Sequence, residues 1–136
     1  MPCILLTGAT GYIASHTWLA LQEAGFDVVG IDSLVNSSVK VLDRIETIGR
    51  RAPHFVQGDV RDAAALDRCF ELARTRFGGI QAVVHFAALK AVGESVERPL
   101  DYFENNLGGL LSVCQAMKRH GVNNLVFSSS ATGYGR

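Results

Sequence analysis

The chain has 136 residues, of which 48% are hydrophobic and 19% charged, a composition that excludes a disordered chain and suits one globular domain. Lys and Arg total 13, and Asp and Glu also total 13, so the basic surplus of a nucleic-acid-binding module is absent. No apolar run reaches the roughly 18 residues of a membrane helix, and the N-terminus lacks the pattern of a signal peptide. We therefore expect neither a nucleic-acid nor a membrane partner.

Short apolar runs alternate along the chain with longer amphipathic segments, which indicates strands alternating with helices. In chain order the pattern predicts a strand over residues 3–7, a helix over 12–24, a strand over 27–32, a helix over 39–48, a strand over 54–58, a helix over 62–76, a strand over 80–87, a helix over 100–120 and a strand over 122–128. Such an alternation is typical of an α/β fold whose parallel sheet is covered on both faces. With a glycine-rich first turn, we expect one domain over residues 1–136 with a doubly wound, Rossmann-like sheet of strand order 3-2-1-4-5.

The three cysteines, Cys3, Cys69 and Cys114, lie far apart and form no CxxC pair. Their odd number argues against a disulfide framework, so we expect reduced thiols and a cytoplasmic protein. His, Cys, Asp and Glu show no metal-ligand spacing anywhere in the chain, and we expect no metal site. His85 stands near the end of a predicted buried strand, where we interpret it as a structural hydrogen-bonding residue.

Residues 7–14, TGATGYIA, lie between the first predicted strand and the first predicted helix. Gly8 permits a tight turn, Gly11 lets the backbone approach a pyrophosphate, and the small Ala14 allows the helix to pack on the strand. The amides at the start of the helix attract phosphate. This context favours a dinucleotide site over the alternative, a structural turn without a ligand.

Asp32 ends the second predicted strand, 24 positions after Gly8. A carboxylate at this place accepts hydrogen bonds from ribose hydroxyls and repels a 2′-phosphate. No Arg follows it directly, which favours NAD over NADP. Asp59, after the third strand, is a candidate acceptor for the adenine amino group, and its alternative role is that of a loop residue before a helix.

Several motifs together resemble the extended short-chain dehydrogenase/reductase family and, within it, the UDP-glucose 4-epimerases. They are TGATGYIASH at 7–16, GDVR at 58–61, HFAALKAVGES at 85–95, NN at 105–106 and SSSAT at 128–132. The glycine-rich turn is common to the superfamily, whereas LKAVGES at 89–95 is far more specific to the 4-epimerases. The resemblance extends over nearly the whole chain.

The resemblance implies interconversion of UDP-glucose and UDP-galactose, a reaction of galactose metabolism in which NAD removes hydride from C4 of the hexose and returns it. It also implies roles for the matching residues. These are Tyr12 and Ile13 at the pyrophosphate; Asp32, Ser33, Leu34, Val35, Asn36 and Ser37 at the adenosine ribose and nearby phosphate; Asp59 and Val60 at adenine; Phe86, Ala87, Ala88, Leu89 and Lys90 at the nicotinamide half; Asn105 in the cofactor site; and Ser130 as the catalytic serine at the 4-oxygen of the sugar.

The Tyr-x-x-x-Lys pair of that family is missing from these 136 residues, since Tyr12 is followed by His16 and Tyr102 by Asn106 at the relevant spacing. We therefore expect the cofactor-binding part of a longer enzyme that acts on a UDP-hexose, without its substrate domain. We also expect this chain to be inactive alone and to self-associate, or to form a homodimer, through surfaces that truncation leaves uncovered.

Two positions depart from the family pattern: Ala14 stands where glycine is usual, and Gly133 stands where valine is usual. Two other interpretations remain open. One is another nucleotide-sugar epimerase or a dehydratase of the same superfamily, and the other is a dinucleotide-binding module without chemistry.

Overall fold

The structure is a computed structural model that describes residues 2–34, 40–86 and 99–128, with the backbone alone for 99–107 and Ser128. Strands and helices alternate along it. The elements are β1 (Cys3–Thr7), α1 (Tyr12–Glu23), β2 (Asp27–Asp32), α2 (Lys40–Gly49), β3 (His54–Gln57), α3 (Ala63–Phe77), β4 (Ile80–Phe86), α5 (Pro99–His120) and β5 (Leu125–Ser128). The order of elements is the predicted one; β1 and β2 have the predicted boundaries, and those of the other elements differ by at most three residues.

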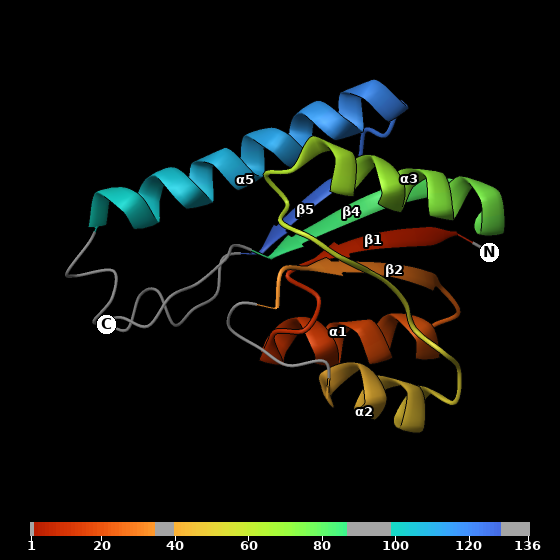
Figure 1. Ribbon diagram of the computed structural model, residues 1–136. Helices are drawn as coiled ribbons and strands as arrows, with labels where there is room; N and C mark the ends of the chain where they lie inside the picture. Colours follow the sequence, from red (N-terminus) through yellow and green to blue (C-terminus); the bar gives the residue numbers. More distant parts are fainter. Residues whose placement is uncertain (1, 35–39, 87–98, 129–136) are drawn as a thin grey trace.

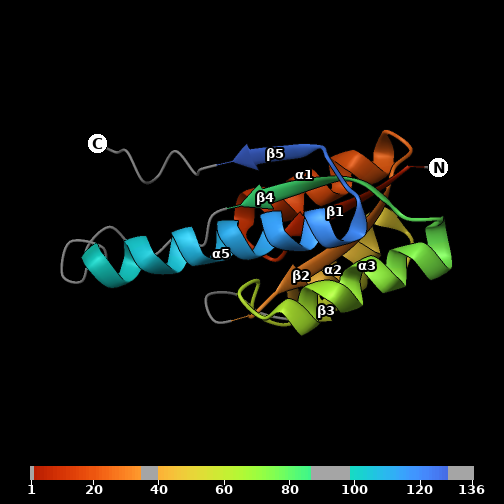
Figure 2. The ribbon, with the colours of Figure 1, turned by 90° about the horizontal axis from the view of Figure 1, so that it is seen from above.

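The five described strands form one sheet in the order β3-β2-β1-β4-β5, and every neighbouring pair is parallel. Figure 2 shows β1 at the centre with α3 and α5 across one face. The prediction of a doubly wound parallel sheet is confirmed. The chain leaves β1 for one face of the sheet and β4 for the other, so the two central strands form the point at which the winding reverses.

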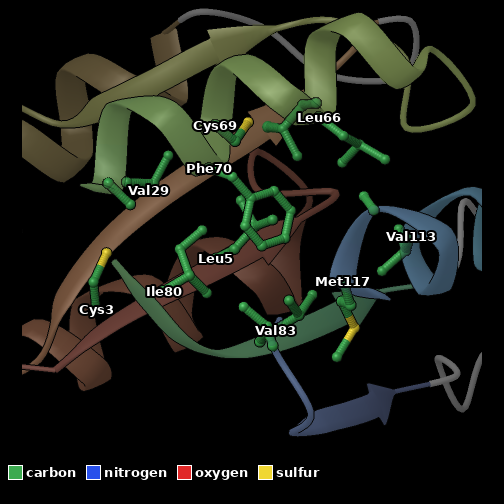
Figure 3. Packing of buried hydrophobic residues seen from close by; sticks show 14 of the residues in the cluster. Cys3, Leu5, Val29, Leu66, Cys69, Phe70, Ile80, Val83, Val113 and Met117 are labelled. Atoms are coloured by element: carbon green, nitrogen blue, oxygen red, sulfur yellow. The ribbon is translucent and has the colours of Figure 1, made fainter. Parts of the chain in front are cut away.

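Alternate residues of β1 and β2 pack into two cores, one on each face of the sheet. Leu5 and Val29 belong to the core beneath α3 and α5, and Leu6 and Val28 to the core beneath α1 and α2. Figure 1 shows the two helical layers, and Figure 3 shows the first core. Because successive side chains of a strand point to opposite faces, a strand buried on both sides must be apolar throughout.

Trp18 of α1 is completely buried over the sheet, and Gly30 of β2 makes room for it. A methyl group added at Gly30 would lie 2.3 Å from Cζ3 of Trp18 and 2.8 Å from Cβ of Ala9. The packing of α1 on the sheet therefore depends on a strand residue without a side chain.

Both ends of α3 lie one residue beyond those of the predicted helix over 62–76, and each end has a local determinant. Asp62 caps the helix, its carboxylate accepting a hydrogen bond from the amide of Ala64 at 3.0 Å. Gly78 ends it with a φ of +83°, the left-handed conformation that favours glycine.

The predicted start of the last strand is wrong by three residues. Gly121 has a φ of +71°, and the amide of Val122 donates to the carbonyl of Met117 at 2.9 Å. These residues therefore close the end of α5, and β5 begins only at Leu125. Val122 is nevertheless buried, in the core beneath α3 and α5.

Within the described residues, none of the helices combines the length and apolar character needed to cross a membrane, and His, Cys, Asp and Glu form no metal-binding group of three or more. Cys3, Cys69 and Cys114 are free thiols. Burial raises the pKa of Cys3 and of Cys69 to about 12, so neither thiol is a nucleophile at neutral pH.

Candidate functional site

The turn between β1 and α1 is built around Gly8. This residue has a φ of +62°, and an added methyl group would lie 3.2 Å from the carbonyl oxygen and 3.3 Å from Cβ of Phe86. The amide of Gly11 closes the turn by donating to the carbonyl of Gly8 at 3.1 Å. Both backbone conformation and the proximity of β4 therefore require glycine at position 8.

The start of α1 has no side-chain cap. Gly11 occupies the capping position in an extended conformation, and no acidic residue stands in the first turn. A helix leaves its first amides without carbonyl partners and carries a partial positive charge at that end. Tyr12 and Ile13 begin the helix, and their side chains are 78% and 52% exposed. This arrangement suits an anion bound by backbone amides, as predicted for a pyrophosphate.

Ile13 is an apolar residue that lies exposed at the start of α1. The buried residues of α1 are Ala14 and Trp18. Ala14, in the third position of the glycine-rich motif, is 2% exposed. A methyl side chain is therefore accommodated where the family usually has glycine.

The Asp32 carboxylate is held from two sides. Its Oδ2 accepts a hydrogen bond from the amide of Thr10 at 3.0 Å, and its Oδ1 accepts one from the amide of Leu34 at 2.9 Å. The second bond supports Leu34 in a left-handed conformation, with a φ of +65°. Because a carboxylate accepts about four hydrogen bonds, both oxygens keep capacity for the hydroxyls of a ribose.

Thr7, His85 and Phe86 form a buried polar network across the β1–β4 pair. The Phe86 amide donates to Thr7 Oγ1 at 3.0 Å, and Thr7 Oγ1 lies 2.7 Å from Nδ1 of His85. Burial lowers the pKa of His85 to about 4, so its ring is neutral at neutral pH. The Thr7 hydroxyl, which accepts from Phe86, is thus also hydrogen-bonded to Nδ1, and the tautomer of the ring decides which of the two donates. This confirms the interpretation of His85 as a structural hydrogen-bonding residue.

Asp59 follows β3 and forms an ion pair with Arg61, whose Nη2 lies 2.6 Å from Oδ2. The amide of Arg61 also donates to Oδ1 at 2.8 Å. The hydrogen bonds from the Arg61 side chain hold the pKa of Asp59 below its ordinary value. The loop that holds Asp59, between β3 and α3, lies next to the end of β2, because the amide of Gly58 donates to the carbonyl of Asp32 at 3.0 Å.

The described candidate residues gather at the carboxyl ends of neighbouring strands: Gly8 to Ile13 after β1, Asp32 to Leu34 at the end of β2, Asp59 and Val60 after β3, and Phe86 at the end of β4. In parallel sheets this edge is where ligands bind. The remaining predicted site residues, Val35, Asn36, Ser37, Ala87, Ala88, Leu89, Lys90 and Ser130, lie outside the described residues. Asn105 belongs to α5, and its side chain also lies outside them.

Sequence reasoning did not find two residues that shape this edge. The Thr10 amide anchors Asp32, and the Thr7 hydroxyl links β1 to β4. The signal for Thr7 was a polar residue at the last position of an otherwise apolar strand, which needs a hydrogen-bond partner when it is buried.

Comparison with known proteins agrees with the fold and with the motifs. Residues 4–136 match the NAD dependent epimerase/dehydratase family. The sequence is 49% identical over 135 residues to a UDP-glucose 4-epimerase of Neisseria meningitidis serogroup B, covering 99% of this chain and 38% of that protein.

Solved structures give the same result. The fold is similar to a UDP-glucose-4-epimerase from Stenotrophomonas maltophila with bound NAD and formylated UDP-arabinopyranose, with a TM-score of 0.86, 47% identity and coverage of 99% of this chain and 39% of that one. For a UDP-glucose 4-epimerase from Bifidobacterium longum in complex with NAD+ and UDP, the TM-score is 0.86 and the identity 44%, over 98% of this chain and 38% of that one. The chain thus spans less than half the length of these relatives.

Proposed function

The chain belongs to the NAD dependent epimerase/dehydratase family, and on that premise we propose that it binds NAD as the N-terminal part of a UDP-glucose 4-epimerase. The observation that carries the proposal is the pairing of two features at one edge of the sheet. One is the uncapped start of α1 behind Gly8 and Gly11, and the other is the Asp32 carboxylate, anchored to the same turn through the Thr10 amide.

The described residues fit a dinucleotide. The amides of Tyr12 and Ile13 would bind the pyrophosphate, and the glycines at 8 and 11, which keep side chains away from the turn, support this role. Asp32 would accept hydrogen bonds from the adenosine ribose, and its negative charge disfavours the 2′-phosphate of NADP. When bound, NAD supplies the acceptor and donor of hydride at C4 of the hexose.

The other predicted contacts complete this proposal. Asp59 and Val60 would meet adenine, and Phe86 with residues 87–90 would border the nicotinamide half. Ser130 would hydrogen-bond the 4-oxygen of the sugar. Neighbours of known structure contain NAD, UDP or a UDP-sugar derivative, which supports NAD as the cofactor and a UDP-hexose as the substrate.

Calorimetric titration of the chain with NAD and with NADP tests the cofactor assignment. We expect NAD to bind and NADP to bind at least about tenfold more weakly, the effect of placing a phosphate against one carboxylate in a partly solvated site. Equal affinities would contradict the role of Asp32, and absence of binding by NAD at millimolar concentration would contradict the function.

The reaction is tested on the full product of the gene, with UDP-glucose, UDP-galactose and their N-acetylated forms as substrates. Interconversion at C4 supports the epimerase, whereas loss of water from the sugar would indicate a dehydratase. Because residues 1–136 contain no Tyr-x-x-x-Lys pair, we expect the chain by itself to bind NAD without converting UDP-galactose.

The downstream coding sequence of the same gene distinguishes the enzyme from the alternative, a dinucleotide-binding module without chemistry. A Tyr-x-x-x-Lys pair encoded downstream supports the enzyme, because a lysine beside a tyrosine lowers the pKa of the tyrosine that acts as the base. A stop codon before such a pair supports the module.

A further inference from the structure

Two adjacent glycines, Gly108 and Gly109, stand in the interior of α5. Glycine is the least favourable residue after proline inside a helix, so a glycine pair there needs a reason in the packing. Both glycines face the loop between β3 and α3. A methyl group added at Gly109 would lie 3.1 Å from Cγ2 of Val60, and one added at Gly108 would lie 3.6 Å from Cδ of Arg61.

The two contacts differ in kind. At 3.1 Å a methyl group at position 109 is closer to Val60 than an ordinary contact, so Val60 would have to give by a few tenths of an ångström, whereas 3.6 Å is an ordinary van der Waals separation. Gly109 is buried and Gly108 is only half-buried. Helix α5 therefore approaches the loop most closely at Gly109.

Contacts with the core and within the loop hold Val60 in place. It is partly buried and packs against the core beneath α3 and α5. The loop is closed by a hydrogen bond from the amide of Asp62 to the carbonyl of Asp59 at 2.8 Å. Asp59 is tied in turn to Arg61 through the backbone and the guanidinium. A displacement of Val60 thus moves the Asp59 carboxylate.

We propose that Gly109 is a positioning residue for adenine recognition: its lack of a side chain lets α5 serve as the support against which Val60, and through it Asp59, is held. The inference rests on the proposed function, in which Asp59 accepts a hydrogen bond from the amino group of adenine. In this proposal Gly109 acts through Val60 and not by contact with the cofactor or the substrate.

The test compares NAD with nicotinamide hypoxanthine dinucleotide, in which an oxygen replaces the adenine amino group. The ratio of the two dissociation constants reports the amino-group contact. A change in the folded fraction alone weakens both ligands equally and leaves this ratio unchanged. The proteins compared are the unsubstituted chain, Gly109→Ala and the matched control Gly108→Ala, with folding checked by thermal unfolding.

We expect the unsubstituted chain to prefer NAD by about tenfold, the value of one hydrogen bond to a charged acceptor. Gly109→Ala should lose most of that preference, while Gly108→Ala should keep it. The double variant V60A/G109A removes the methyl group that obstructs the new side chain, so it should recover part of the preference. If Gly109→Ala does not fold, folding of V60A/G109A supports the contact, and failure of both to fold overturns it.

An unchanged ratio in Gly109→Ala, or an equal loss in Gly108→Ala, overturns the inference while leaving NAD binding intact. If the unsubstituted chain binds neither dinucleotide, the proposed function fails and the inference fails with it. Binding without any preference for NAD overturns the role of Asp59 on which the inference depends.

Discussion

Thr7 and His85 are 78 positions apart in the sequence, and Oγ1 of Thr7 lies 2.7 Å from Nδ1 of His85. The two residues are direct partners in the β1–β4 register. The same Thr7 oxygen accepts from the amide of Phe86 at 3.0 Å. One hydroxyl therefore satisfies a ring nitrogen and a backbone amide where the two central strands reach the candidate cofactor site.

Thr7→Val should destabilise the chain by about 1–3 kcal/mol, because it keeps the shape of the side chain but leaves the Phe86 amide without its acceptor and Nδ1 of His85 without its hydrogen-bond partner. Thr7→Ser keeps the hydroxyl and should be closer to the unsubstituted chain. Urea unfolding measures both. Equal losses in the two variants would show that the methyl group, and not the hydrogen bonds, carries the effect.

His85 should make stability depend on pH in the mildly acidic range. Its pKa is lowered from 6.5 to about 4 by burial, so between these values the unfolded chain binds a proton that the folded chain does not. Stability is unaffected by this group above pH 6.5 and falls as the pH is lowered through the window, by about 3 kcal/mol in total. Unfolding curves from pH 7 to pH 4 measure the slope.

His85→Gln removes the titrating ring and should flatten this dependence. A smaller slope should remain from His54, whose pKa is also lowered by burial. Asp59 and Asp67 have lowered pKa values, and their contributions begin to be lost only below about pH 5, so the slope above that pH reports the histidines. An identical slope in the variant would contradict a neutral, buried His85.

Asp32→Asn should weaken NAD binding by about tenfold or more, since a neutral amide is a poorer acceptor for ribose hydroxyls than a carboxylate. It should also reduce the discrimination against NADP. Asp62→Asn is a matched control, because it removes the same charge from a residue that caps α3, and asparagine retains capping ability. Calorimetric titration measures NAD binding by both variants. An equal loss of affinity in the two would show that the net charge of the chain, and not a contact of Asp32 with the ribose, carries the effect.

Gly30→Ala should destabilise the chain by about 3 kcal/mol, because the new methyl group would overlap the Trp18 ring, 2.3 Å from Cζ3. Adding Trp18→Phe removes the ring carbons that stand in the way. The double variant should therefore lose less than the sum of the two single variants, a coupling that chemical denaturation can measure. Additive losses would contradict the tight fit.

Periodicity and glycine placement were sufficient to predict the order of elements and the strand order of the sheet. They also placed Gly8, Asp32 and Asp59 at strand ends, because parallel strands separated by helices bring those ends to one edge. Both ends of α3 were predicted to within one residue, since Asp62 and Gly78 decide them locally.

Contacts between distant segments could not be predicted in this way. No local pattern explains the glycine at position 30, and only packing shows that Trp18 occupies the space beside it. The start of β5 was missed because Val122, an apolar residue, closes a helix end through Met117 instead of joining the sheet. The Gly109–Val60 contact depends on how α5 lies across the molecule, which no local pattern encodes.

Gly11 begins α1 without a side-chain hydrogen bond, whereas Asp62 gives α3 such a bond. A phosphate oxygen bound to the first amides of α1 would do for that helix what a capping carboxylate does for the other. Ligand release should then let the opening turn of α1 fray, so that ordering of this turn and occupancy by the dinucleotide form one coupled equilibrium. In this chain the cofactor would be part of the secondary structure that binds it.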